Sequence, residues 1–403
     1  GGSSVSQCHS FVPDISMPGG IPTTFQAPAL TVAVFFAITG TVYQAPKTCF
    51  VSGKLRYSKL PVHDTASASH SLVKLSIRGN GNGDMWHRGR RHVSHLKALD
   101  EADQDLYVEP VFRPPAEAGS IILQVTNGCS WNRCSFCDMY TAPQKSFRAK
   151  SLEEIESDLK LLRMLWDMEE TGVPPRFFLA DGDAMSLPTM HLRAILHLIR
   201  EAFPEVARVS SYCLPRNLRG KTVEDLVVMR HLGLRTLYVG CESGDDEILK
   251  RIGKGESHQS SLAALQKISA ANLKTSVMIL HGLGGTQLSE QHAKRSAELA
   301  SKAQPNFLST LVVSFPLGVE RHAKRFADVQ GGFQELTPLQ VLEEMNRFIK
   351  ELDLKRTIFR SDHASNYLSL KGVLGRDKAK LLKEIAAAKA GNVALRPEWA
   401  RGL

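Results

Sequence analysis

Three cysteines lie within nine residues in the stretch TNGCSWNRCSFCDMY, residues 126–140. Cys129, Cys134 and Cys137 have the spacing C-x4-C-x2-C, and no fourth cysteine or histidine follows nearby. Thiolates are soft ligands that suit zinc and iron–sulfur clusters, so this polar loop predicts a metal site. A closed zinc site takes four protein ligands, whereas three thiolates on a four-iron cluster leave one iron open to a further ligand.

A structural zinc ion is the alternative for these thiols. Cys213 and Cys241 could supply a fourth ligand, but each falls at the end of a later predicted strand. The chain has seven cysteines in 403 residues, too few and too irregularly placed for a disulfide-stapled secreted scaffold. We therefore favour an iron–sulfur cluster over zinc.

The elements that must position the cysteines begin near residue 118, where apolar β-like runs alternate with amphipathic helical stretches. This alternation is typical of parallel βα units, and six units suit a partial barrel better than a closed one. Strands are predicted at 120–126, 176–180, 207–213, 235–240, 274–280 and 306–314. Helices are predicted at 151–169, 187–202, 223–232, in a region ending at 271, and at 289–303.

The chain is expected to have three parts. The fold class is α/β, with a partial (β/α)6 barrel at 118–320 and a short C-terminal α/β extension at 321–403. The extension is predicted to contain a helix at 338–351, a short strand at 357–359 and a helix at 377–390. A leader occupies residues 1–105.

Unusual polar residues gather at the predicted strand ends. In parallel α/β barrels the carboxyl ends of the strands carry the chemistry, so these residues are expected to surround the cysteine loop. The stretches are Asp181-Gly182-Asp183, Ser210-Ser211-Tyr212, Gly240-Cys241-Glu242-Ser243-Gly244 and His281-Gly282-Leu283-Gly284-Gly285.

The cysteine loop resembles the cluster loop of the radical SAM superfamily, including the aromatic Phe136 before the third cysteine. The stretch YVGCESGDDEILKRIGKG (238–255) resembles the branch that contains tRNA methylthiotransferases, the Elongator catalytic subunit and oxygen-independent coproporphyrinogen oxidases. The usual loop of the superfamily is C-x3-C-x2-C, so this chain has one extra residue between Cys129 and Cys134.

The resemblance implies a partial barrel with two cofactors, a 4Fe–4S cluster and S-adenosylmethionine. One electron from the reduced cluster would cleave S-adenosylmethionine to methionine and a 5′-deoxyadenosyl radical, which abstracts hydrogen from a substrate. The residues implied to contact S-adenosylmethionine are Phe136, Gly182, Asp183, Ser210, Glu242, Gly282 and Gly284. Simple turn chemistry for the glycines, strand polarity for Ser210 and a structural salt bridge for Glu242 are the alternatives.

Substrate contacts are expected from polar residues near the cluster loop and after the last strand. The candidates are Tyr140, His281, His363 and Asn366, although the stretch FRSDHASNY (359–367) could equally form a packed polar cap. Outside the leader only Cys213 and Cys241 remain, too few for a second cluster. No cobalamin-type motif precedes the barrel. The substrate is a small molecule or another unidentified compound, and the reductant is of the ferredoxin or flavodoxin kind.

The leader differs from the rest in composition. Residues 1–100 hold ten Lys and Arg against four Asp and no Glu, so most of the net charge of +9 lies there. An acid-poor, Ser-rich leader predicts plastid or mitochondrial targeting, with a plain extension of a cytoplasmic protein as the alternative. The apolar run 29–38 is shorter than the ~20 residues that span a bilayer, so no membrane span is expected. A structural zinc or iron–sulfur protein that binds nucleic acid is the second functional hypothesis, but the location of the charge does not support it.

Overall fold

The computed structural model describes residues 106–168 and 172–402, which belong to one compact unit, Ser69–Leu403. Eight strands form one sheet in the order β1-β4-β5-β6-β7-β8-β9-β10. Their bounds are β1 Ile121–Gln124, β4 Arg176–Ala180, β5 Arg208–Cys213, β6 Leu234–Glu242, β7 Lys274–His281, β8 Phe307–Val312, β9 Ile358–Ser361 and β10 Leu370–Val373. All neighbours pair in parallel except β9 and β10, which confirms the partial barrel.

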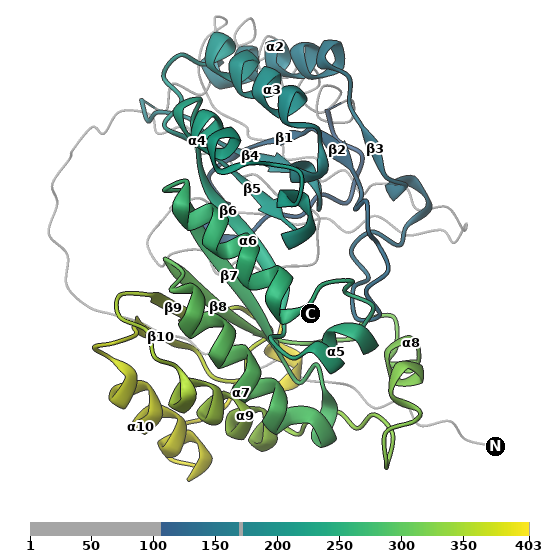
Figure 1. Cartoon of the computed structure of the whole chain (residues 1–403), viewed down its shortest axis with the longest axis vertical. Helices are drawn as coiled ribbons and strands as arrows, with labels where there is room; N and C mark the ends of the chain where they lie inside the picture. The colour runs from purple at the N-terminus through teal and green to yellow at the C-terminus, as the bar shows by residue number, and fades with distance from the viewer. Residues whose placement is uncertain (1–105, 169–171, 403) are drawn as a thin grey trace, which may run out of the picture. The chain divides into compact units, whose positions relative to one another are not determined.

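The longer helices cover the outer side of this sheet, and each of them packs against the next long helix along the chain (Figure 1). The long helix α2 begins with a capping box. The Ser151 amide donates to Glu154 Oε2 at 2.7 Å, and the Glu154 amide donates to Ser151 Oγ at 3.2 Å. The bounds are α2 Leu152–Met168, α3 Thr189–Ala202, α4 Val223–His231, α5 Asp246–Arg251, α6 His258–Ala270, α7 Gly285–Ala303, α8 Glu320–Ala323, α9 Pro338–Glu351 and α10 Lys378–Lys389.

Alternate side chains of the strands point to two different environments, as the period of a strand requires. One set packs under the helices in the main apolar core, which includes Phe177 of β4 and Val239 of β6. The other set lines the inside of the barrel, where Phe178 and Tyr238 form a small aromatic cluster with Tyr212. The inner face is therefore largely filled at this level of the barrel.

The first predicted strand is divided in the structure. β1 ends at Gln124, and β2 (Thr126–Asn127) pairs instead with β3 (Arg148–Ala149) in an antiparallel ladder. The apolar run at 120–126 could not show this break, since it depends on pairing with residues beyond the cysteine loop. The ladder closes the base of that loop.

The C-terminal extension continues the barrel sheet. β9 pairs with β8, and α9 packs against α7 on the outer side (Figure 1). β10 was not predicted, because four residues that include a glycine carry no clear periodicity. The predicted leader, residues 1–105, lies outside the described residues. No helix among the described residues is long and apolar enough to cross a membrane.

We predict that Phe177→Ala lowers the free energy of unfolding by ~3–5 kcal/mol, because it leaves a cavity in the main core. The Phe177 ring is fully buried and meets Phe203 edge to face at 4.8 Å. Urea denaturation measures the change. Met190→Ala is the control, since this side chain is 68% exposed. Equal losses for the two variants would contradict the packing described.

Candidate functional site

A buried ion pair fastens the cysteine loop to the sheet. Lys145 and Asp181 pair with no exposed side-chain surface on either residue. The same carboxylate oxygen accepts hydrogen bonds from the Gly128 amide at 3.0 Å and from Gln124 Nε2 at 3.2 Å. Asp181 directly follows β4, and Gly128 directly precedes the first cysteine. The start of the loop is therefore held by a charge at a strand end.

Gly128 requires the backbone conformation that glycine adopts easily. Its φ is +70°, and a Cβ at this position would lie 2.1 Å from the carbonyl oxygen of Lys145. The loop backbone thus passes directly over the residue that neutralises Asp181.

The three cysteine thiols of the loop form one group. Burial raises the pKa of each thiol, that of Cys137 to about 12, while the positive charge of Lys254 acts in the opposite direction. Cys129 and Cys134 also raise the pKa of Cys137, as close negative neighbours do. Three partly buried, mutually close thiols are the soft donor set that an iron–sulfur cluster takes.

The spacing of the thiols does not favour a single metal ion. Among the described residues, one group of three histidine, cysteine or acidic side chains has its ligand atoms all within 4.8 Å, and it is elsewhere. A cluster of several irons holds its ligands farther apart than one ion does. Cys213 and Cys241, the suggested fourth ligands for zinc, are buried in the main apolar core.

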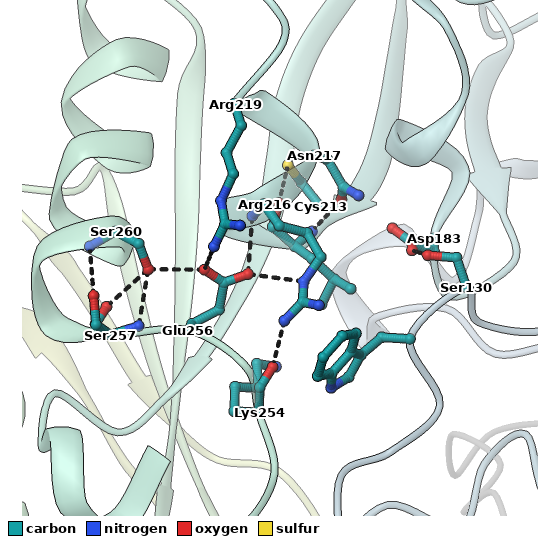
Figure 2. Close-up of polar contacts among 12 residues, drawn as sticks. Ser130, Asp183, Cys213, Arg216, Asn217, Arg219, Lys254, Glu256, Ser257 and Ser260 are labelled. Carbon is teal, nitrogen blue, oxygen red and sulfur yellow. Dashed lines mark hydrogen bonds and ion pairs between the residues drawn. The ribbon is translucent and has the colours of Figure 1, made fainter. Parts of the chain in front are cut away.

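Trp131 anchors the stretch between Cys129 and Cys134, which is one residue longer than usual. Its indole Nε1 donates to the Gly253 carbonyl at 2.7 Å, and the Arg216 guanidinium lies 3.5 Å from its ring centroid. A Cβ on Gly255 would fall 2.3 Å from the indole. Arg216 is held in turn by Glu256, whose carboxylate accepts from its Nε at 2.9 Å (Figure 2). The residues between the first two cysteines therefore dock on the segment after α5.

The short helix α8 contacts the end of the same loop. Arg321 donates to the Cys137 carbonyl at 2.7 Å and pairs with Asp138 at 2.5 Å. The buried His322 places its Nδ1 2.9 Å from Ser135 Oγ. The loop is thus held on three sides, by the sheet, by the segment after α5 and by α8.

Lys254 brings a buried positive charge to the thiols. It is 3% exposed, and its Nζ lies 2.8 Å from Glu242 Oε1. Burial alone would lower the pKa of Lys254, but Glu242 and Cys134 together raise it, so the amine stays protonated. Glu242, at the end of β6, has a φ of +64°. The positive charge of Lys254 favours the thiolate form of the cysteines that metals require.

Asp183 faces the loop from the end of β4. One carboxylate oxygen accepts from Ser130 Oγ, and Oδ1 is buried with no hydrogen-bond partner among the described residues (Figure 2). Burial raises the pKa of Asp183, while the hydrogen bond from Ser130 opposes that rise. A pocket of about 420 Å³ opens beside this pair, lined by Ser130, Ser186, Leu187, Pro188, Thr189, Arg216, Asn217, Gly220 and Lys221.

The sequence model of the Radical SAM superfamily matches residues 123–299, the part of the chain that contains this loop and the strands up to β7. Residues 123–299 form a radical SAM domain. The match of this domain agrees with the two cofactors expected from the sequence, a 4Fe–4S cluster and S-adenosylmethionine.

Two curated relatives match the radical SAM region. The 4'-phospho-dehydrooxetanocin synthase of Priestia megaterium is 27% identical over 172 residues, covering 38% of this chain and 22% of that protein. The heme chaperone HemW of Bacillus subtilis is 20% identical over 184 residues, covering 45% of this chain and 47% of that protein. The chain therefore spans less than half the length of either relative.

Among solved structures, coproporphyrinogen III oxidase (HemN) from Escherichia coli aligns with a TM-score of 0.42 and 15% identity, over 61% of this chain and 54% of that one.

Several residues expected to bind S-adenosylmethionine surround the cysteine loop of the radical SAM domain. Gly182 lies against Tyr140, since a Cβ there would fall 2.4 Å from the tyrosine ring. Phe136 packs on a small apolar cluster that includes Leu283, which lies between Gly282 and Gly284. These residues, with Asp183 and Glu242, stay predicted contacts.

Other predicted residues lie away from the loop. Ser210 is three residues before the end of β5, level with Phe178 inside the barrel, and its buried hydroxyl has no partner among the described residues. His281 points under the helices and contacts Glu344 of α9. The roles of these two side chains stay predictions.

The candidate substrate residues His363 and Asn366 belong to a hydrogen-bonded cap. Asn366 is fully buried and donates to the Thr310 carbonyl at 2.8 Å, and His363 Nδ1 lies 2.9 Å from Ser365 Oγ. Arg396 donates to the carbonyls of both candidates. Substrate contact and a packed polar cap were the two alternatives for this stretch. These contacts favour the packed polar cap at the β8–β9 edge.

The sequence interpretation missed four residues that hold the radical SAM loop: Lys145, Trp131, Arg216 and Lys254. A signal existed for Lys254, because it stands between two glycines, Gly253 and Gly255, that both have positive φ. The partners of the other three come from distant parts of the chain, so no local pattern marks them.

We predict that Lys145→Met costs ~3–5 kcal/mol in the free energy of unfolding, because it leaves the buried carboxylate of Asp181 unpaired. Arg148→Met is the matched control. It breaks an ion pair with Glu154 whose side chains are 54% and 42% exposed, and should cost less than ~1 kcal/mol. Urea unfolding at neutral pH measures both variants, and similar losses would argue against the anchoring role.

We also predict a pH dependence that originates from His322. Burial lowers the pKa of His322 to about 4, whereas an unfolded histidine titrates near ~6.5. Between these values the unfolded chain binds a proton that the folded chain does not, so stability is lost as the pH falls through this window, by about 3 kcal/mol in all. His322→Gln should lack this part of the slope in urea titrations, and identical slopes would contradict the assignment.

Proposed function

We propose that the chain binds a 4Fe–4S cluster through Cys129, Cys134 and Cys137 and cleaves S-adenosylmethionine reductively to act on a further substrate. The observation that carries this proposal is the group of three thiols, which has no fourth protein donor in place among residues 106–168 and 172–402. The other two described cysteines, Cys213 and Cys241, are buried in the core between sheet and helices. A site with three ligands leaves one iron for the substrate-activating cofactor.

When bound, the cluster supplies one electron and S-adenosylmethionine supplies the 5′-deoxyadenosyl group that abstracts hydrogen. The chain's own residues position the three thiols and favour their charged thiolate form. Burial raises the pKa of the thiols, and the positive charge of Lys254 opposes that rise, which favours the thiolates that the irons require. The buried Lys145–Asp181 pair keeps the first cysteine over the end of β4.

Asp183 suits the methionine end of S-adenosylmethionine. Its free Oδ1 is an acceptor beside the first cysteine, and a carboxylate pairs well with an amino group. Burial raises the pKa of Asp183, so an ammonium neighbour would restore the charged form. Gly182 leaves no side chain between this carboxylate and Tyr140, and lets a ligand approach the backbone closely.

The extra residue between Cys129 and Cys134 has a structural role in this proposal. It allows Trp131 to reach the Gly253 carbonyl while both cysteines stay in the thiol group. The docked indole also places Arg216 beside the pocket that opens next to Ser130. We infer that this pocket admits a polar part of the substrate or of S-adenosylmethionine.

The proposal is tested by the cluster content of cysteine variants. After anaerobic reconstitution with iron and sulfide, the full chain should hold about four irons and four sulfides. Cys134→Ala should lose most of them and lose the electron paramagnetic resonance signal of the reduced cluster. Cys213→Ala, a buried thiol in the apolar core, is the matched control and should keep both. Full cluster content in Cys134→Ala would sink the proposed ligand set.

A further inference from the structure

Two histidines and a glutamate meet under the helices, on the opposite side of β7 from the inside of the barrel. His281 ends β7, His292 lies on α7 and Glu344 on α9. Each side chain is wholly buried. His281 Nδ1 lies 3.1 Å and His292 Nε2 lies 3.8 Å from the same oxygen, Glu344 Oε1. All three ligand atoms fall within 4.8 Å of one another.

These separations suit donors that share one ion. Ligands about 2.0–2.2 Å from a zinc ion lie roughly 3–4 Å from each other in a tetrahedral arrangement. Two imidazoles and one carboxylate are a common ligand set for divalent transition metals. The donor set differs from that of the cysteine loop, which offers three thiols.

The cluster also has bonding capacity that the protein leaves unused. The Nε2 atoms of both His281 and His292 are buried and have no hydrogen-bond partner among the described residues. An unpaired buried polar group is costly, so each one calls for an explanation. A cation beside Glu344 Oε1 would accept the lone pair of His292 Nε2, the atom that lies 3.8 Å from that oxygen.

The charge states of these side chains also favour a bound cation. Burial alone would raise the pKa of Glu344, but the hydrogen bond from Ser289 opposes that rise and favours the ionised carboxylate. Burial lowers the pKa of His292, which keeps that ring neutral. An ionised carboxylate beside a neutral imidazole is the state in which both groups bind metals.

Surrounding groups already orient the three side chains. Ser243 Oγ lies 2.9 Å from His292 Nδ1. Glu344 accepts from Ser289 Oγ at 2.6 Å and from the Gly282 amide at 2.8 Å. Such outer contacts set ring and carboxylate orientation around protein-bound metals.

We propose that His281, His292 and Glu344 bind one divalent transition-metal ion, with zinc the best fit, which ties the end of β7 to α7 and α9. The site has a structural role, because fully buried ligands leave no room for a substrate. It is separate from the cysteine loop and does not depend on the function proposed for that loop.

The test uses the full chain with Cys129→Ser, Cys134→Ser and Cys137→Ser, so that zinc cannot occupy the thiols. This chain, produced with added zinc and then desalted, should contain about one zinc per chain by mass spectrometry of the metals. His292→Gln and Glu344→Gln in the same background should each reduce this to less than about one tenth. His258→Gln is the matched control, a buried histidine that bonds the Gly244 carbonyl, and should keep the zinc.

A second measurement covers variants that fold poorly. Adding zinc during refolding of the cysteine-free chain should raise its thermal midpoint by about 3 °C or more, and Glu344→Gln should not respond. Cobalt in place of zinc should give the visible absorption of a tetrahedral ion. A cysteine-free chain with no zinc and no thermal response would overturn the proposal, as would zinc retained by both variants. Neither result bears on cluster binding, which is measured in the chain with its cysteines.

Discussion

The buried ion pair between Lys145 and Asp181 is the constraint on which the rest of the site depends. A loop with little regular structure must hold three thiols in one place, and it begins directly after the sheet has ended. The pair lies where β4 stops, and its carboxylate also receives the amide that precedes the first cysteine. With both side chains out of water, neither charge can be removed without leaving the other unpaired.

Two further contacts complete the support of the loop. Trp131 docks between Arg216 and the Gly253 carbonyl, and α8 holds the other end through Arg321. The segment that receives Trp131 also carries Lys254, the buried positive charge beside the thiols. Mechanical support and electrostatic support of the cysteines therefore come from the same short stretch of chain.

Much of this arrangement was predictable from the sequence, for physical reasons. Strong alternation of apolar runs and amphipathic helices located the six strands of the barrel, and β4 and α9 have the predicted bounds. Motif spacing identified the three cysteines as one group. The pairing of β2 with β3 was not predictable, because it depends on residues beyond the cysteine loop. The four residues of β10 carry no clear periodicity, so this strand was not predictable either.

The same limit applied to the role of individual side chains. His281 stands among glycines at a strand end, where substrate contact was a reasonable expectation, but the period of β7 turns it under the helices. The interactions of Glu242 illustrate the opposite case. The structural salt bridge considered as an alternative is present, with Lys254, and it brings charge to the thiols as well.

In this proposal, three thiols leave one iron of the cluster open, and S-adenosylmethionine is cleaved there. The most direct measurement is the yield of 5′-deoxyadenosine when the reconstituted chain, reduced with dithionite under anaerobic conditions, is mixed with S-adenosylmethionine. We expect 5′-deoxyadenosine and methionine to form in equal amounts, and only with the reductant present. A chain that holds its full cluster, is reduced and still releases no 5′-deoxyadenosine would show that the open iron does not cleave S-adenosylmethionine.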